Sequence, residues 1–413
     1  MSFNWQTEED WDDLSSLEEP ESPTPRCRWL YVLAVVLVLA VAAGGIWWRL
    51  NQRVDEVSAD LIGDVTASLQ LVRRAVEVED AELFTSLLSG RDATWAEQQQ
   101  TLMQEGLYLN RSDLGMEWQP GSSSVLDVSL SADLQEATVQ VSESYEVSVG
   151  NGISTTVRMQ REETYRLGDA RWLLAHPAGG MDWGETLTHV GPQLTLSYPE
   201  KDMALAERIA NDLDRKIAEA CDPALGAVCT PEAQLEVVFT TNLSLLADMR
   251  SPLFTLAGDA RIIMPAPSLV GIPRDEAGYN ALFRGYATPI VSRFLAQASG
   301  YRCCRHVLFF QALLDRQLAQ LGLKPWPLAP DHYRLIFESD LVLRNVNEMW
   351  QITDPAEARP VDSLQAHIVT DYLLFQHPNL TAAMLQRSLM EAGSYWEWLN
   401  LHVSADLETL DRS

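Results

Sequence analysis

The hydrophobic pattern begins with one continuous apolar run near the N-terminus. Residues 29–48 read WLYVLAVVLVLAVAAGGIWW, 20 residues without a charged side chain. At about 1.5 Å of helical rise per residue, such a run matches the roughly 30 Å hydrocarbon core of a bilayer. Trp29 and Tyr31 stand at one end, and Trp47 and Trp48 at the other, where aromatic rings favour the headgroup level. The pattern predicts one transmembrane helix over residues 29–48.

Two alternatives to an uncleaved span are a cleaved signal peptide and a buried core helix. A signal peptide needs a basic start, whereas the leader before residue 29 is long and acidic. The tripeptide Ala40-Val41-Ala42 does resemble a cleavage site, so this alternative stays open. The uncleaved helix is the favoured interpretation.

The bases that flank the apolar run are balanced and do not decide its orientation. A short N-terminal tail and a large C-terminal part are typical of a signal anchor, with the tail inside. Cysteine usage agrees, because Cys27 stands alone on the tail side and the other four cysteines form an even set beyond the membrane. We therefore expect a single-pass cell-membrane protein with a cytoplasmic N-terminus and extracytoplasmic C-terminal domains.

The tail, residues 1–28, is acidic and of low complexity, and we expect it to be disordered. Aromatic and leucine side chains are spaced among the acids. The tail is either a solvated spacer or an acidic-aromatic motif that docks on a cytoplasmic partner.

Residues 54–188 change from a helical pattern to a strand pattern. Apolar residues recur at three- and four-residue steps from Val54 to Val76, which predicts an amphipathic helix. From Ala137 to Val149 apolar and polar residues alternate, which predicts a strand with one solvated face. We also expect helices over residues 81–88 and 94–108, strands over 125–130, 153–167 and 171–175, and a tight turn at Asn151-Gly152.

Helices followed by an antiparallel meander, with YRLGDARW from Tyr165 to Trp172, resemble the nuclear-transport-factor-two-like (SnoaL-like) domain. The resemblance implies an α+β cone around a pocket, which some members use for catalysis and many for binding or oligomerisation. Catalytic members place an Asp/His pair in that pocket. Here His176 and Asp182 follow the meander beside Pro177, and we expect them to form an exit turn.

Residues 189–413 combine short strands with long helices. Leu205, Ile209, Leu213 and Ile217 repeat at four-residue steps, which predicts a helix with one apolar face. We expect strands over residues 194–198, 235–239 and 261–264, and helices over 275–298, 306–321, 361–375, 379–390, 394–399 and 406–410.

This order of elements resembles the peptidase MA-like, gluzincin-type metallopeptidase domain. In that family a strand–helix–strand lead-in ends in a short strand that lines the substrate cleft. An active-site helix follows, and a second helix brings a third metal ligand. The resemblance therefore implies a ligand cleft whose candidate residues are Arg261, Met264, Tyr286 and Arg316.

The chemistry of that family is not matched. A gluzincin needs H-E-x-x-H, in which two His bind zinc and the Glu polarises the metal-bound water, and this chain has no such motif. The alignment places Gly285-Tyr286-Ala287-Thr288-Pro289 there, and Arg316 falls where the third ligand is expected. Glycine and proline side chains cannot ligate a metal, and a guanidinium repels Zn²⁺. We expect a degenerate scaffold without metal or other cofactor, with a helix kinked at Pro289.

One other group of metal-ligating residue types is His306 with Cys303 and Cys304. Adjacent cysteines converge poorly on a metal. A metal site, disulfides and free thiols all stay open for the four outer cysteines. A bond between Cys303 and Cys304 would close a strained ring, so cross-links from Cys221 and Cys229 to that pair are attractive.

The net charge of the chain argues against nucleic acid as a partner. The 413 residues carry 58 acids and 30 bases, a net charge of −28, which leaves no basic surface for nucleic acid. Eight acids and two bases, a net −6, fall within residues 1–48. In so acidic a chain, pairs of carboxylates occur by chance and do not indicate a catalytic site. We expect Glu162, Glu163 and Glu207 on solvated faces.

Together these patterns predict an α+β, single-pass membrane protein. Its extracytoplasmic part, residues 54–188 and 189–413, is expected to be a non-catalytic pseudo-metallopeptidase that binds a peptide or protein. One alternative is a signalling or scaffold protein that acts through its acidic tail. Another is an enzyme that uses the cone pocket, which predicts buried polar residues converging there.

Overall fold

The structure is a computed structural model. It describes residues 25–150, 153–178, 180, 182–222, 234–249, 261–338 and 343–402. These residues are mixed helix and strand, which confirms the expected α+β class. The chain divides into two units, Met1–Gly63 and Asp64–Ser413. The predictions for residues 1–24, for the Asn151-Gly152 turn and for the helix over 406–410 lie outside the described residues.

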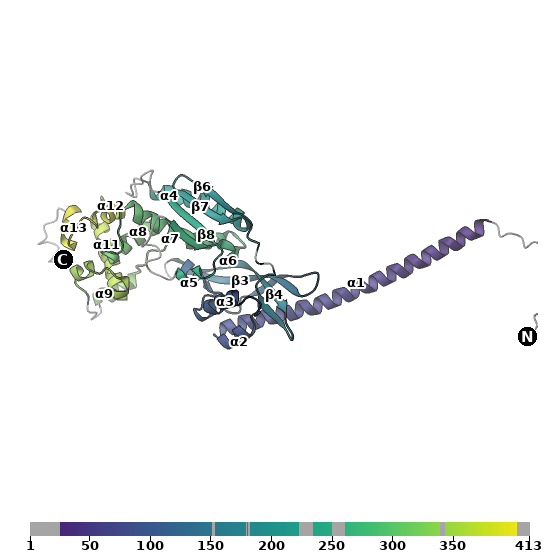
Figure 1. The fold of residues 1–413 in the computed structure, drawn as a ribbon. Helices are drawn as coiled ribbons and strands as arrows, with labels where there is room; N and C mark the ends of the chain where they lie inside the picture. The colour runs from purple at the N-terminus through teal and green to yellow at the C-terminus, as the bar shows by residue number, and fades with distance from the viewer. Residues whose placement is uncertain are drawn as a thin grey trace, which may run out of the picture. The chain divides into compact units, whose positions relative to one another are not determined.

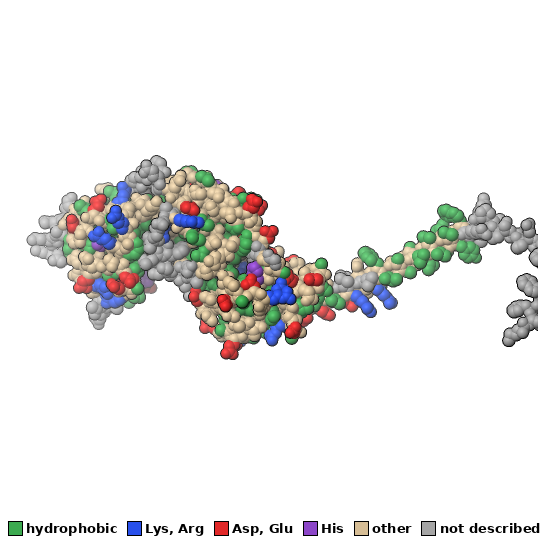
Figure 2. All heavy atoms as spheres, viewed as in Figure 1, with side chains coloured by type: hydrophobic (Ala, Val, Ile, Leu, Met, Phe, Trp, Pro, Cys, Tyr) green, Lys and Arg blue, Asp and Glu red, His purple; other side chains and the backbone are tan. Residues whose placement is uncertain are grey.

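The helix α1 (Pro25–Glu77) contains the whole predicted transmembrane run. Every side chain from Tyr31 to Arg49 is exposed, and Figure 2 shows apolar side chains along this part of the helix. Within the described ranges α1 is the one helix long and apolar enough to cross a membrane. The amphipathic helix predicted from Val54 is a continuation of the same helix.

In the second unit, the last turns of α1 are buried. Val65, Leu69 and Val72 of the predicted apolar stripe are buried there, together with Ala75. Two short helices follow, α2 (Ala81–Ser86) and α3 (Ala93–Gln104). Asp80 and Asp92 cap them, and each carboxylate accepts a 2.9 Å hydrogen bond from a backbone N–H of its own helix. These caps explain why both helices begin where they do.

The six-stranded sheet is built on one long antiparallel pair, β3 (Glu136–Gly150) with β4 (Ile153–Leu167). This hairpin confirms the predicted strands. The shorter strands lie at its edges: β1 (Glu117–Trp118) and β2 (Ser124–Leu130) on β3, and β5 (Trp172–Ala175) and β10 (Ile272–Pro273) on β4.

The four-stranded sheet follows along the chain, in the order β6-β7-β8-β9. The strands are β6 (Thr186–Val190), β7 (Leu194–Pro199), β8 (Leu235–Thr240) and β9 (Arg261–Pro265). The last three are parallel, and β6 pairs antiparallel with β7. The expected boundary between residues 188 and 189 falls inside β6. The helix α4 (Met203–Ala220) packs on β7 through the predicted apolar face (Figure 1).

The long helix α7 (Glu276–Ala298) connects the two sheets. It begins at Asp275, whose carboxylate accepts a 2.7 Å hydrogen bond from the backbone N–H of Gly278, and it continues past Pro289. It contacts α4 on one side, and β4 and η1 (Ser112–Leu114) on the other. Because β10 also joins the six-stranded sheet, both sheets belong to one packed unit.

The remaining elements are mostly helices. Of these, α11 and α12 pack on α8. The sequence pattern missed α9 and α10, which are short. The bounds are α5 (Leu245–Asp248), α6 (Pro267–Val270), α8 (Val307–Gln320), α9 (Pro330–Glu338), α10 (Val346–Trp350), α11 (Pro360–Gln376), α12 (Ala382–Ser388) and α13 (Tyr395–His402), with 3-10 turns η2 (Glu200–Asp202) and η4 (Pro355–Glu357).

Candidate functional site

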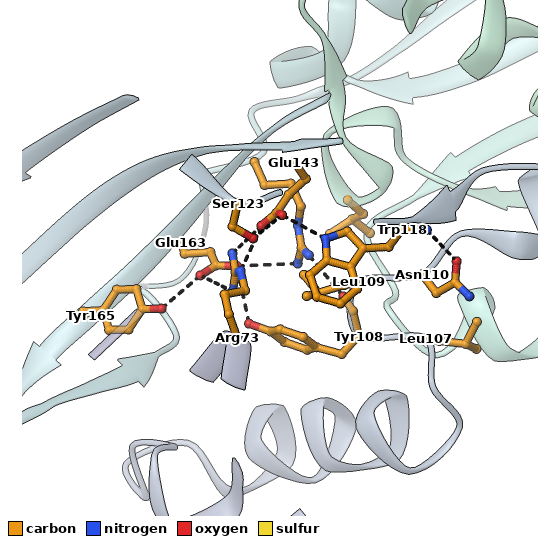
Figure 3. Close-up of polar contacts among 12 residues, drawn as sticks. Arg73, Leu107, Tyr108, Leu109, Asn110, Trp118, Ser123, Glu143, Glu163 and Tyr165 are labelled. Atoms are coloured by element: carbon orange, nitrogen blue, oxygen red, sulfur yellow. Dashed lines mark hydrogen bonds and ion pairs between the residues drawn. The ribbon is translucent and has the colours of Figure 1, made fainter. Parts of the chain in front are cut away.

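A cluster of charged side chains lies buried between α1 and the six-stranded sheet (Figure 3). Arg73 on α1 reaches Glu143 on β3 and Glu163 on β4, and its Nη2 lies 2.8 Å from an oxygen of each carboxylate. Its Nε donates to Glu143 at 2.9 Å and its Nη1 to Glu163 at 3.2 Å. All three side chains are shielded from solvent. We call this group the Arg73 cluster.

All four carboxylate oxygens of the Arg73 cluster accept hydrogen bonds. On Glu143, one oxygen accepts from Arg73 Nε and forms an ion pair with Arg73 Nη2, and the other accepts from the Trp118 indole at 3.0 Å and from the Ser123 hydroxyl. On Glu163, both oxygens accept from Arg73. The Tyr165 hydroxyl donates a further hydrogen bond of 3.1 Å to one of these oxygens, and the Tyr108 hydroxyl donates one of 3.4 Å to the other. Because these lone pairs are engaged, neither carboxylate is free to act as a general base.

Strand alternation explains why these side chains meet. Every odd-numbered residue from 137 to 147 on β3 is buried, and on β4 the odd-numbered residues from 157 to 165 are buried or half-buried. Glu143 and Glu163 therefore share the inner face with apolar residues. The prediction of a solvated Glu163 is wrong, since it is 6 % exposed, whereas Glu162 and Glu207 are exposed as expected. The alternation of buried and exposed positions along β4 is the sequence signal that could have placed Glu163 on the inner face.

Beside the Arg73 cluster lies a small cavity of about 90 Å³, which we call the arginine cavity. Arg111 and Arg161 both line it, and Glu163 and Tyr108 connect it to the cluster. Arg161 donates to the Tyr108 carbonyl at 3.1 Å. The cavity also has an apolar wall, formed by Trp95, Leu102, Leu174 and Leu269.

Burial and neighbouring charges set the protonation states around this cavity. Burial alone would raise the pKa of Glu163, but Arg73 and Arg161 outweigh it and hold that pKa below its usual value. Burial, reinforced by the Glu163 carboxylate, raises the pKa of the Tyr108 phenol. Burial lowers the pKa of Arg111 to about 10, so this guanidinium is charged at neutral pH. The cavity wall therefore contains charged arginines, a charged carboxylate and a neutral phenol.

Two of the predicted cleft residues, Met264 and Tyr286, are core residues. Met264 lies on β9 and is fully buried, as is Tyr286 on α7. The Tyr286 hydroxyl donates a 2.7 Å hydrogen bond to the Pro265 carbonyl. This bond ties α7 to the end of β9, so Tyr286 faces the four-stranded sheet and does not line the arginine cavity.

Of the other two, Arg261 is exposed and Arg316 is half-buried, and they lie on different elements with different partners. Arg261 begins β9, where its Nε is 3.4 Å from Glu236 on β8. Arg316 lies on α8, 3.4 Å from Asp371, and its guanidinium lies over the Trp326 ring. The structure thus brings Met264 and Tyr286 to one interface but does not bring all four candidates together.

The part of α7 that aligns with the metal motif packs against η1, the 3-10 turn that contains Leu114. A Cβ at Gly285 would lie 2.8 Å from the Leu114 carbonyl oxygen and 2.9 Å from the Leu114 Cβ. Gly285 and Pro289 line a cavity of about 320 Å³, together with Leu114 and Lys324. We call it the α7 cavity. Arg316, which aligns with the third metal ligand, does not line this cavity.

A second buried charged group joins α8 to α11, and the sequence pattern did not indicate it. Asp315 accepts from His367 Nε2 at 2.9 Å and lies 2.9 Å from Lys324 Nζ. His367 Nδ1 lies 2.7 Å from the Ser363 carbonyl. Both ring nitrogens of His367 therefore face acceptor oxygens. Burial opposes ionisation of Asp315, but His367 and Lys324 outweigh it and hold its pKa below the usual value.

The cysteines are arranged differently from the favoured expectation. Cys303 and Cys304 are bonded to each other, across a cis peptide bond. A cross-link from Cys221 to that pair is therefore absent, although Cys221 is itself disulfide-bonded. The prediction for Cys229 lies outside the described residues.

The predicted candidates His306, His176 and Asp182 each have their own contacts. His306 stacks on Trp350 and bonds the Trp350 carbonyl at 2.7 Å. His176 lies 3.7 Å from Asp92, while Asp182 accepts from the backbone N–H of Gly184. His176 and Asp182 therefore have different partners.

A catalytic zinc does not fit the residues aligned with the peptidase motif. Gly285 and Pro289 offer no donor atom, the Tyr286 hydroxyl is bonded to a carbonyl, and Arg316 is cationic. Across the described ranges, no group of three or more His, Cys, Asp or Glu side chains is placed to hold a metal ion.

Comparisons with protein families, with curated proteins and with solved structures found no match to this chain.

Proposed function

We propose that this is a single-pass membrane protein whose extracytoplasmic part is a binding module without catalytic activity. In this proposal residues 54–188, which supply α2, α3 and the strands β1 to β5 of the six-stranded sheet, form a nuclear-transport-factor-two-like domain. Residues 189–413 form a degenerate peptidase MA-like domain. Its four-stranded sheet, α7 and α8 follow the expected order of elements.

The contact between Gly285 and Leu114 carries the proposal. A metal-binding side chain at position 285 would need space that the Leu114 backbone already occupies. The aligned stretch of α7 therefore serves as a packing surface for the other sheet's loop. This use of the helix is incompatible with a first metal ligand at that position.

The apolar part of α1 supports the anchor. Its side chains from Tyr31 to Arg49 are all exposed, and such a run is stable in lipid but costly in water. The extracytoplasmic placement of the large unit rests on the signal-anchor layout. A cysteine introduced at exposed Arg171 would react with an impermeant maleimide on intact cells, and labelling only after lysis would contradict this orientation.

Metal content and peptide cleavage test the lack of catalysis. The full-length chain, purified in detergent without chelators, is expected to contain no stoichiometric zinc and to leave a mixed peptide library uncut. Cleavage that stops on chelation and returns with zinc would overturn the proposal. Size-exclusion chromatography is the control, because cleavage that does not co-elute with the chain belongs to a contaminating peptidase.

An enzyme using the cone pocket is the weaker alternative. Buried polar residues do converge there, as that alternative requires. However, the lone pairs of Glu143 and Glu163 are occupied by Arg73 and four neutral donors. This arrangement favours a role in holding the pocket's shape over acid–base chemistry.

A further inference from the structure

Two arginines and two glutamates line the arginine cavity: Arg111 and Arg161, with Glu162 and Glu163. Glu163 is committed to Arg73, which also pairs with Glu143, and the exposed Glu162 pairs with Lys201 at 3.6 Å. Arg161 approaches Glu163 only to 3.9 Å. The two tyrosines beside Glu163 are neutral because burial raises the pKa of each phenol. One guanidinium charge therefore has no carboxylate partner within this group.

Arg111 carries that unmatched charge. It is 3 % exposed, and its Nη1 donates to the carbonyls of Leu107 at 2.6 Å and Asn110 at 2.7 Å. Its Nη2 has one long contact, 3.4 Å, to the Leu269 carbonyl, and its Nε has no hydrogen-bond partner. A buried guanidinium that contacts only carbonyls is an unfavourable arrangement, and an anion would relieve it.

The cavity's polar lining provides further contacts for an anion. Arg161 shares the wall with Arg111, and the side chains of Gln99 and Thr164 line it too. Guanidinium groups bind carboxylates with good geometry, because their N–H groups form a planar fork. Leu174 and Leu269 also line the cavity, and their apolar side chains suit a short aliphatic chain.

Charge and size select the ligand class. The single Arg111 charge without a carboxylate partner is neutralised by a monovalent anion. A cavity of about 90 Å³ has room for a ligand of a few heavy atoms, larger than a single water. We propose that the arginine cavity binds a small monovalent carboxylate, with its oxygens on Arg111 and Arg161 and its aliphatic end against Leu174 and Leu269. This proposal goes beyond the binding module proposed above, which names no ligand. It also survives if that module proves to cleave peptides.

Calorimetric titration of the full-length chain in detergent tests the proposal. Sodium propanoate should bind saturably, while propanamide, which has nearly the same shape without the charge, should not. Arg161→Gln should weaken propanoate binding at least tenfold. The matched control, Arg171→Gln, removes the same charge from an exposed turn and should leave the affinity unchanged.

A cavity-filling variant tests the proposal independently, in case the Arg161→Gln chain misfolds. Leu269→Trp keeps all charges and should abolish binding, with the far-UV circular dichroism unchanged. The assignment is overturned if the wild-type chain shows no saturable binding, if propanamide binds as well as propanoate, or if Arg171→Gln weakens binding as much as Arg161→Gln. Tighter binding of inorganic phosphate than of propanoate would overturn the carboxylate class.

Discussion

Arg73 and Glu163 are 90 residues apart in the chain, yet two hydrogen bonds of 2.8 and 3.2 Å join them inside the six-stranded sheet's core. The bond joins the last turns of α1 to the centre of β4. Because both groups are buried, each depends on the other for charge compensation. Four predictions follow from this and similar contacts.

Loss of Glu163 should strongly destabilise the protein. Glu163→Gln leaves Arg73 buried with one carboxylate, and we expect a loss of about 3–5 kcal/mol in the free energy of unfolding. Urea denaturation of the full-length chain in detergent, followed by tryptophan fluorescence, measures it. Glu162→Gln is the control, because its ion pair with Lys201 is exposed and worth less than about 1 kcal/mol. Equal losses in the two variants would show that the buried pair contributes little.

The effect of Glu163→Gln should depend on pH. The pKa of Glu163 in the folded state is below its usual value, so the charged form stabilises the fold at neutral pH. This contribution is present above the unfolded pKa of about 4.3 and is lost as the pH falls through the folded pKa. The difference in unfolding free energy between wild type and variant should therefore shrink below about pH 4.3. A difference that stays constant down to pH 3 would contradict the lowered pKa.

The contact of Gly285 with Leu114 should make position 285 intolerant of a methyl group. Gly285→Ala places a Cβ against backbone atoms, and we expect a loss of about 1–3 kcal/mol. Gly90→Ala is the control, since a Cβ there meets no atom within 4 Å, and it should cause no loss. Thermal unfolding of the three proteins compares them. A Gly285→Ala chain as stable as wild type would remove the main support for the non-catalytic proposal.

The buried pair of Asp315 and His367 should hold α8 to α11. Asp315→Asn leaves His367 and Lys324 without their carboxylate, and we expect a loss of about 3–5 kcal/mol. Hydrogen exchange should show faster opening of α11. Asp331→Asn removes an exposed ion pair with Arg334 and should change exchange little. If both variants exchange alike, the Asp315–His367 pair has no special role.

Local periodicity predicted most of the elements but few of their partners. The strand over Ile153–Leu167 has the predicted bounds, and α7 begins one residue after the predicted start, with Asp275 as its cap. β10 was missed because two residues are too short to show a period. For the site, the sequence placed Arg261, Met264, Tyr286 and Arg316 at one cleft, where the structure does not bring all four together, and it gave no indication of Arg111.

The sequence by itself determined the apolar run of α1 and the strand pair β3–β4, because the spacing of apolar residues decides which local structure buries them. It also determined that the peptidase motif is missing. Only the tertiary structure decided that Arg73 meets Glu143 and Glu163, and that Arg111 keeps a charge without a carboxylate partner among the described residues. Such contacts depend on strand register and on how α1 packs against the sheet, and neither is encoded in the spacing of nearby residues.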